Sequence, residues 1–235
     1  MSADDGKIAA ARAALDFVEP GMRLGIGTGS TAAHFVRLLG EKVRAGLVVA
    51  GAPTSEATRR LMETHGVPLL DIDAVEDLDL AVDGADEVDA DLSLIKGGGG
   101  ALLREKIVAA AARRFIVIAD ESKRVSRLGA YPLPVEATPF GIGQTARKVG
   151  RALRDAGCAG DVVSLRMAGP AGKPFVTDGA NYILDCAARA IPDAAALAAA
   201  LKRIPGIVED GLFVGMAKTL VVGRADGGVE QVDLH

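Results

Sequence analysis

The chain has 235 residues, a formal net charge of −4, and a composition that is 49% hydrophobic and 3% aromatic. This length fits one large domain or two modest ones. The acidic balance and the few aromatic rings exclude the basic, ring-rich surface that binds nucleic acid, so we expect no nucleic-acid partner.

Cysteine and histidine usage indicates neither a metal site nor a disulfide framework. Cys158 and Cys186 are the two cysteines, and the three histidines are scattered without ligand spacing. The acidic N-terminus has no apolar core of the kind that a signal peptide carries. The longest Ala/Leu run, residues 194–201, is far shorter than the ~20 residues that span a bilayer. We therefore expect a cytoplasmic protein with no membrane partner, no cofactor and no metal.

The N-terminal part predicts a helix, a strand and a glycine-rich turn. Residues 4–18 have apolar residues at helical spacing, with Lys7 near the start. A strand over residues 22–26 leads into the turn that contains Thr28, Gly29, Ser30 and Thr31, and a helix follows. Ser30 and Thr31 can cap this helix, whose start is a potential phosphate site. The turn is neither a Walker loop nor a dinucleotide fingerprint, and by itself it fits a plain tight turn equally well.

Short apolar segments then alternate with helical ones. This pattern predicts a parallel sheet that is covered on both faces and binds ligands at the carboxyl ends of its strands. The predicted strands are residues 47–50, 67–70, 78–82 and 115–119, and the predicted helices are residues 54–65 and 100–114.

Most of the polar side chains that are suited to catalysis lie in residues 79–106. Asp83 and Asp86 flank Gly84 and Ala85 at a turn, and Lys96 precedes four consecutive glycines. Glu105 lies early in the helix that follows. We expect Gly98 or Gly99 either to approach a bound ligand too closely for a Cβ or to need a positive φ. The alternative is a plain turn, a flexible loop and solvated charges. If this edge binds a sugar phosphate, Glu105 is suited to abstract a proton beside a carbonyl, with Lys96 and backbone N–H groups stabilising the oxyanion. Taken without its neighbours, Glu105 fits a surface helix glutamate better.

The C-terminal half does not continue the regular alternation of strands and helices. Two prolines in residues 131–135 predict a linker into an edge strand. A helix over 141–156, three short strands and a helix over 192–202 predict a small α+β domain. Residues 207–213 and 219–222 are expected to return to the first domain. The predicted fold is α/β: a Rossmann-like parallel-sheet domain (1–130 plus 206–235) with a smaller inserted α+β domain (131–205).

Several motifs together resemble ribose-5-phosphate isomerase, type A, in unbroken order over nearly the whole chain. They are GIGTGSTAA at 25–33, VDGADE at 82–87, IKGGGGALLREK at 95–106, ADESK at 119–123, PLPVE at 132–136, PGIV at 205–208 and GLF at 211–213.

The resemblance implies that the chain interconverts D-ribose 5-phosphate and D-ribulose 5-phosphate through an enediolate. It implies Glu105 as the proton acceptor, with Asp83, Asp86 and Lys96 at the sugar end. It further implies a ferredoxin-like smaller domain with an oligomerisation role, and a homodimer or homotetramer. The implied substrate-binding residues are Lys7, Thr28, Gly29, Ser30, Thr31, Gly84, Ala85, Gly97, Gly98, Gly99 and Lys123.

The chain departs from the family pattern at one position, and two alternative functions remain open. Ala180 stands in the turn of residues 177–181 where the family pattern predicts glycine. A non-catalytic sugar-phosphate sensor is one alternative, but it has no reason to keep both Lys96 and Glu105. Another phosphosugar isomerase or deaminase with a similar sheet is the second alternative.

Overall fold

The computed structural model describes residues 3–169 and 172–234, and the chain forms two compact units. The first unit comprises Met1–Ala85, Arg104–Arg124 and Gly215–His235, and the second comprises Asp86–Leu103 and Val125–Val214. This division differs from the predicted domain boundaries because the segments 86–103, 125–130 and 206–214 belong to the second unit.

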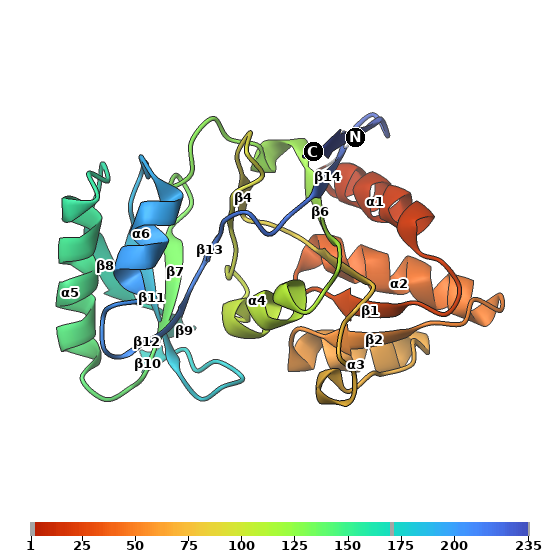
Figure 1. Cartoon of the computed structure of the whole chain (residues 1–235), viewed down its shortest axis with the longest axis horizontal. Coiled ribbons are helices and arrows are strands. Elements are labelled where there is room, and N and C mark those ends of the chain that lie inside the picture. The colour runs from red at the N-terminus through yellow and green to blue at the C-terminus, as the bar shows by residue number, and fades with distance from the viewer. Residues whose placement is uncertain (1–2, 170–171, 235) are drawn as a thin grey trace. The chain divides into compact units, whose positions relative to one another are not determined.

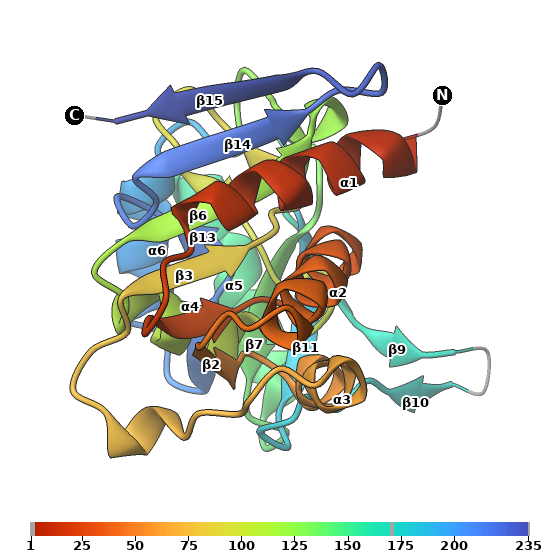
Figure 2. The same cartoon turned by 90° about the vertical axis from the view of Figure 1, so that its right-hand side faces the viewer.

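A six-stranded sheet organises the first unit, in the order β15-β14-β6-β3-β1-β2 (Figure 2). Five of the strands are parallel, and β15 pairs antiparallel with β14 at the edge. The parallel core agrees with the predicted alternation of short apolar strands and helices. The strands are β1 (Arg23–Ile26), β2 (Ala50–Pro53), β3 (Leu80–Asp83), β6 (Phe115–Asp120), β14 (Thr219–Gly223) and β15 (Val229–Asp233).

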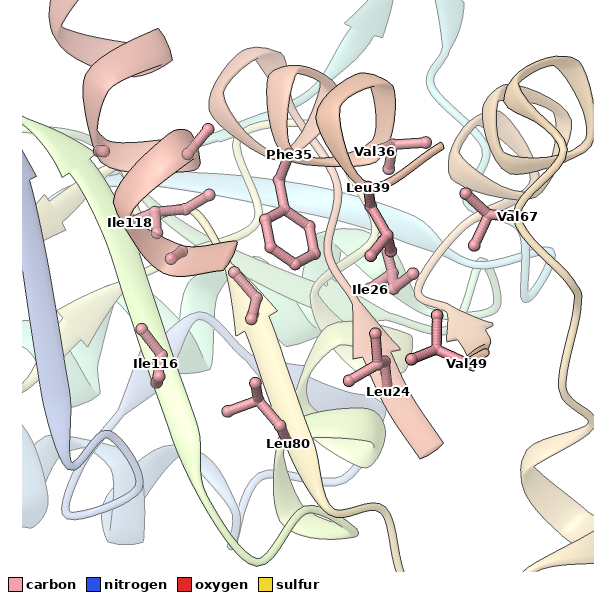
Figure 3. Close-up of a cluster of buried hydrophobic side chains, with 14 of the residues drawn as sticks. Leu24, Ile26, Phe35, Val36, Leu39, Val49, Val67, Leu80, Ile116 and Ile118 are labelled. Atoms are coloured by element: carbon pink, nitrogen blue, oxygen red, sulfur yellow. The ribbon is translucent and has the colours of Figure 1, made fainter. Parts of the chain in front are cut away.

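Alternate residues of these strands face opposite sides of the sheet. Leu24 and Ile26 of β1 belong to the main apolar core together with Phe35 of α2 (Figure 3). Gly25 faces the other side, where an added Cβ would lie 2.4 Å from Val108 of α4. The helical segments are α1 (Ala3–Ala14), η1 (Leu15–Phe17), α2 (Ser30–Arg44), α3 (Glu56–His65), η2 (Ile72–Ala74), α4 (Leu102–Ala110) and η3 (Glu121–Lys123).

The second unit has a ferredoxin-like βαββαβ arrangement, which confirms the predicted α+β class. Its antiparallel sheet has the order β12-β7-β11-β8, and α5 and α6 cover one face (Figure 1). Its elements are β7 (Leu133–Ala137), α5 (Ile142–Asp155), β8 (Val162–Leu165), β11 (Tyr182–Ala187), α6 (Ala194–Leu201) and β12 (Ile207–Asp210).

Short strands complete the second unit. β4 (Glu87–Val88), β5 (Leu94–Ile95) and β13 (Leu212–Phe213) form a three-stranded sheet, and β9 (Met167–Ala168) pairs with β10 (Lys173–Pro174). The prediction that 207–213 returns to the first domain is wrong, because β12 pairs with β7 and β13 pairs with β5.

No helix in the described ranges has both the length and the apolar character needed to cross a bilayer. In the same ranges, His, Cys, Asp and Glu side chains nowhere gather in threes that could hold a metal ion.

Ala180 occupies the left-handed region, with φ 61°. The turn around it is held by the Thr177 hydroxyl, which accepts hydrogen bonds from the N–H groups of Gly179 and Asn181 at 3.2 and 3.1 Å. Thr177 and Asn181 also donate to Glu136 Oε1, at 2.8 and 3.0 Å. The turn therefore keeps its glycine-type geometry, and these hydrogen bonds offset the strain of an alanine at that position.

We predict that Ala180→Gly stabilises the protein. Relief of about 1–2 kcal/mol of left-handed strain exceeds the added unfolded-state entropy of about 0.5–1 kcal/mol. Calorimetry should show a Tm rise of about 1–4 °C for a domain of this size. Ala199→Gly, on the exposed side of α6, is the matched control and should lower Tm, since glycine costs about 0.5–1 kcal/mol inside a helix. A fall in Tm for both variants would contradict the proposed backbone strain at Ala180.

Candidate active site

The Asp83 carboxylate lies at the carboxyl ends of β1 and β3 in the first unit. Its side chain is only 3% exposed, and Oδ1 accepts hydrogen bonds from the N–H groups of Thr28 at 3.0 Å and Gly84 at 2.7 Å. Gly27 faces this carboxylate so closely that an added Cβ would lie 1.9 Å from Oδ1. The glycine-rich turn and Asp83 therefore fit together only because residue 27 has no side chain.

Glu105 shares a small cavity with Asp83. The cavity has no room for a water molecule and is also lined by Gly27, Thr54 and Val108. Glu105 lies in the first turn of α4 and is 4% exposed. Because β3 alternates, Asp83 projects toward the face that α4 covers. Two of the predicted catalytic carboxyl groups thus line one cavity at the predicted edge of the sheet.

A cluster of hydroxyl groups, which the sequence did not predict as part of the site, supports the turn. The Thr28 hydroxyl lies 2.7 Å from that of Thr54, 2.8 Å from that of Ser55 and 3.0 Å from that of Thr58. Thr58 also donates to the carbonyl of Gly27 at 2.9 Å, and Ser55 caps α3. The sequence signal was the position of Thr54 and Ser55 at the start of the helix predicted over residues 54–65. The cluster joins the ends of β1 and β2.

The start of α2 has the geometry of an anion site. Its N-cap is Gly29, with φ 109° and no side-chain cap, so the prediction that Ser30 and Thr31 cap the helix is wrong. Uncapped N–H groups at a helix start attract anions. Lys123 ends η3, directly after β6, and is half-buried. Lys7 is half-buried on α1, one turn beyond Asp4, which lies 3.1 Å from His34 of α2.

Asp86 and Lys96 form part of the second unit. Glu87 of β4 pairs with Ile95 of β5 in an antiparallel ladder, and the N–H of Asp86 donates to the carbonyl of Ile95 at 2.8 Å. Asp86 precedes β4 and Lys96 follows β5, so the ladder places these two residues opposite each other. Lys96 is 2% exposed, and its ammonium lies 5.5 Å from the ring centre of Phe213.

The glycine loop after Lys96 is shaped by protein atoms. Gly97 and Gly100 have φ of 100° and 82°, so the positive angles lie at the ends of the run and not at Gly98. The Gly98 N–H donates to Asp86 Oδ2 at 2.7 Å. A Cβ on Gly98 would lie 2.6 Å from Asp86 Oδ1 and 2.5 Å from the Tyr131 hydroxyl. Close approach at Gly98 was predicted, and here the approaching groups are side chains of the chain itself.

Tyr131 adds a polar group beside this loop. Burial raises the pKa of its hydroxyl, and the negative charge of Asp86 raises that pKa further. The backbone of Tyr131 is held by Glu87, which accepts its N–H at 2.5 Å and that of Gly129 at 2.7 Å. The sequence did not single out Tyr131, because nothing local relates it to a loop more than 30 residues away.

The predicted residues thus form two sets. The first unit holds Asp83, Gly84, Ala85, Glu105, Lys7, Lys123 and the turn from Thr28 to Thr31. The second unit holds Asp86, Lys96, Gly97, Gly98 and Gly99.

Comparison with known proteins decides the family. Residues 50–227 match ribose 5-phosphate isomerase A (phosphoriboisomerase A). The chain belongs to this family. A ribose-5-phosphate isomerase A from Parvibaculum lavamentivorans is 58% identical over 97% of both chains, and one from Maricaulis maris is 53% identical over the full length of both.

Solved structures of the family agree in fold. The isomerase A of Methanocaldococcus jannaschii is 40% identical, with a TM-score of 0.89 over 99% of this chain and 100% of that one. A D-ribose-5-phosphate isomerase in complex with phospho-erythronic acid is 38% identical, with a TM-score of 0.91 over the whole of both chains. The chain is therefore an aldose–ketose isomerase, and the two alternatives drawn from its sequence lose their support.

We predict that Gly98→Ala impairs the isomerase without unfolding it. The new methyl group must displace the Asp86 carboxylate or the Tyr131 hydroxyl, and with it the adjacent amides. We expect kcat to fall about 10²–10³-fold, as for a lost oxyanion donor. Gly143→Ala is the control: it lies in α5, its Cβ would come no closer than 3.9 Å to its nearest neighbour, and it should leave kcat unchanged. Full activity of Gly98→Ala would show that the loop tolerates displacement.

Proposed function

We propose that Glu105 is the proton-transfer base with which this isomerase interconverts D-ribose 5-phosphate and D-ribulose 5-phosphate, within the pentose phosphate pathway. The observation that carries this assignment is the cavity that Glu105 shares with Asp83 at the carboxyl edge of the sheet. Ligands of open parallel sheets bind at this edge. Glu105 is 4% exposed, so its carboxylate is shielded from bulk water. Exclusion of water from a site also protects a reactive enediolate from side reactions.

The proposed reaction begins with the open-chain aldose. Glu105 removes the proton from C2, a C1–C2 double bond forms, and the C1 carbonyl oxygen becomes the oxyanion of an enediolate. Glu105 then returns the proton to C1. The proton of the C2 hydroxyl passes to the oxygen on C1, and C2 becomes the carbonyl. No atom is gained or lost, so the reaction needs no redox partner.

We assign oxyanion stabilisation to the second set of residues. Lys96 supplies a positive charge, and N–H groups of the glycine loop supply donors. Asp83 and Asp86 are assigned to ring opening and to holding the sugar hydroxyls.

We assign the phosphate to the start of α2. Its uncapped N–H groups, the hydroxyls of Ser30 and Thr31, and the Lys123 ammonium are suited to a dianion. Lys7 is a further candidate on α1. The related structure that contains phospho-erythronic acid supports a site of this chemistry, because that ligand joins a phosphate to a planar carboxylate resembling an enediolate.

We also propose that residues 131–205, which belong to the second unit, mediate assembly into a homodimer or homotetramer. Apolar side chains on the surface of the second unit support this role: Phe140 is 94% exposed and Val162 is 64% exposed. Both cysteines are free thiols, which supports a reducing, cytoplasmic location.

We predict that Glu105→Gln abolishes most turnover. The amide keeps the size and hydrogen bonding of the side chain but cannot accept a proton. We expect kcat to fall about 10²–10⁴-fold, the usual contribution of a positioned base. Phospho-erythronic acid should still bind when affinity is measured by calorimetry. Glu41→Gln, on the exposed side of α2, is the matched control and should behave as wild type. Near-normal turnover of Glu105→Gln would rule out this base.

Lys123→Ala should weaken recognition of the phosphate. Loss of its point charge should raise KM for ribose 5-phosphate with little change in kcat. Any weak turnover of unphosphorylated ribose should be unaffected, since that sugar has no phosphate to hold. Lys42→Ala, at the exposed end of α2, controls for a general loss of positive charge. An equal loss on both sugars would mean that Lys123 acts on the reacting carbons or on the fold.

A further inference from the structure

Arg166 lies between β8 and β9 in the second unit and reaches the glycine loop 68 residues earlier in the chain. Its Nη1 donates to the carbonyl oxygens of Gly97 and Gly98, each at 3.0 Å. The same guanidinium pairs with Asp185 of β11, with Nε donating to Oδ2 at 2.9 Å and Nη2 donating to Oδ1 at 2.5 Å. One planar group therefore joins the second unit's sheet to two successive peptides of the loop.

Both the backbone and the side chain of Arg166 are held by neighbouring residues. The Arg166 N–H donates to the carbonyl of Ile183 at 2.8 Å, and its carbonyl accepts from Phe175 at 2.8 Å. The guanidinium lies 5.8 Å from the centre of the Phe175 ring. That ring also fills the space beside Gly100, where an added Cβ would lie 2.4 Å from it. Only 15% of the Arg166 side chain is exposed, so its bonds compete little with water.

The two carbonyl contacts fix the direction of the loop amides together with the Gly100 N–H, which donates to the Gly97 carbonyl at 2.9 Å. In a trans peptide the C=O and the following N–H point to opposite sides. With the Gly97 carbonyl held by Arg166, the Gly98 N–H points away from Arg166, and it meets Asp86 Oδ2 at 2.7 Å. With the Gly98 carbonyl held as well, the Gly99 N–H also points away from Arg166. Arg166 thus orients one amide that holds Asp86 and a second amide beside it.

We propose that Arg166, held in place by Asp185, is a positioning residue of the isomerase reaction. It fixes the peptide planes of Gly97–Gly98 and Gly98–Gly99, so that their N–H groups face Asp86 and the developing oxyanion before substrate arrives. The proposal rests on the oxyanion role proposed above for the glycine loop. Arg166 has no direct contact with the reacting atoms in this account, and it acts through the loop. Arginine suits this task because its rigid fork binds a carboxylate and two carbonyls at once.

The test compares Arg166→Met, Arg166→Lys, Asp185→Asn and the double variant Arg166→Met/Asp185→Asn with the control Arg154→Met. Arg154 also pairs with an aspartate, Asp161, but on the outer surface of α5, where it is 57% exposed. The readouts are kcat and KM for ribose 5-phosphate, amide hydrogen exchange of the peptide covering residues 97–100, and Tm.

We expect Arg166→Met to lower kcat about 10–100-fold, less than the 10²–10³-fold loss of a whole donor, because the amides are displaced and not removed. KM should change less than kcat, and exchange in the loop peptide should rise about tenfold or more while other peptides match the control. Arg166→Lys should recover part of kcat, because an ammonium can bind one of the carbonyls. Asp185→Asn should add little to the loss in an Arg166→Met background, since both act through one guanidinium.

The outcomes separate this proposal from the assignment of the base. Unchanged hydrogen exchange in the loop peptide of Arg166→Met would overturn the proposal that Arg166 holds the glycine loop, whatever happens to kcat. Increased exchange with unchanged kcat would overturn its role in positioning. Failure of the Glu105 assignment would appear instead as turnover by Glu105→Gln, and it would leave the exchange result intact.

Discussion

The buried contact between Asp83 and the turn after β1 is the constraint on which the first unit's site depends. A carboxylate that is almost fully removed from water needs hydrogen-bond donors close by. The N–H groups of Thr28 and Gly84 supply them, one from each of two neighbouring parallel strands. Gly27 must lack a side chain for this contact to form. The same carboxylate therefore holds the turn at the start of α2 and lines the cavity that contains Glu105, so the two ends of the proposed substrate site are coupled.

The second unit uses a comparable device for its glycine loop. Asp86 binds the Gly98 N–H, Arg166 binds the carbonyls on the other side, and Asp185 binds Arg166. Charged groups alternate in sign along this series of contacts, and the Gly97–Gly98 peptide lies between Asp86 and Arg166. Such a network is stronger than its separate pairs because each bond polarises the next. A loop with almost no side chains can thereby hold a defined shape without contributing contacts of its own to the core.

The sequence predicted what local patterns encode. Alternating apolar strands and helices identified the parallel sheet, and the carboxyl-edge rule placed Asp83 and the turn after β1 together. The strand predicted at 47–50 lies instead at Ala50–Pro53, because Gly51 fits against Ile26 where a Cβ would lie 2.5 Å away, while Val48 is exposed. The two-residue strands β4, β5 and β13 are too short to show a period. Arg166 and Tyr131 could not be found either, because their contacts with the loop join residues that are more than 30 positions apart.

The glycine run shows why a motif can be correct and its explanation incomplete. Four glycines ahead of a helix indicate close approach, and the sequence alone suggests that a ligand approaches. In the structure, Gly97 and Gly100 are required by positive φ, and Gly98 is required by Asp86 and Tyr131. Each glycine costs about 0.5–1 kcal/mol of backbone entropy when the loop is ordered. The hydrogen bonds among Arg166, Asp86, Asp185 and the loop offset that cost. An oxyanion site that is already ordered stabilises a transition state without reorganising at the moment of reaction. The conformational cost is thus met in folding, before substrate binds.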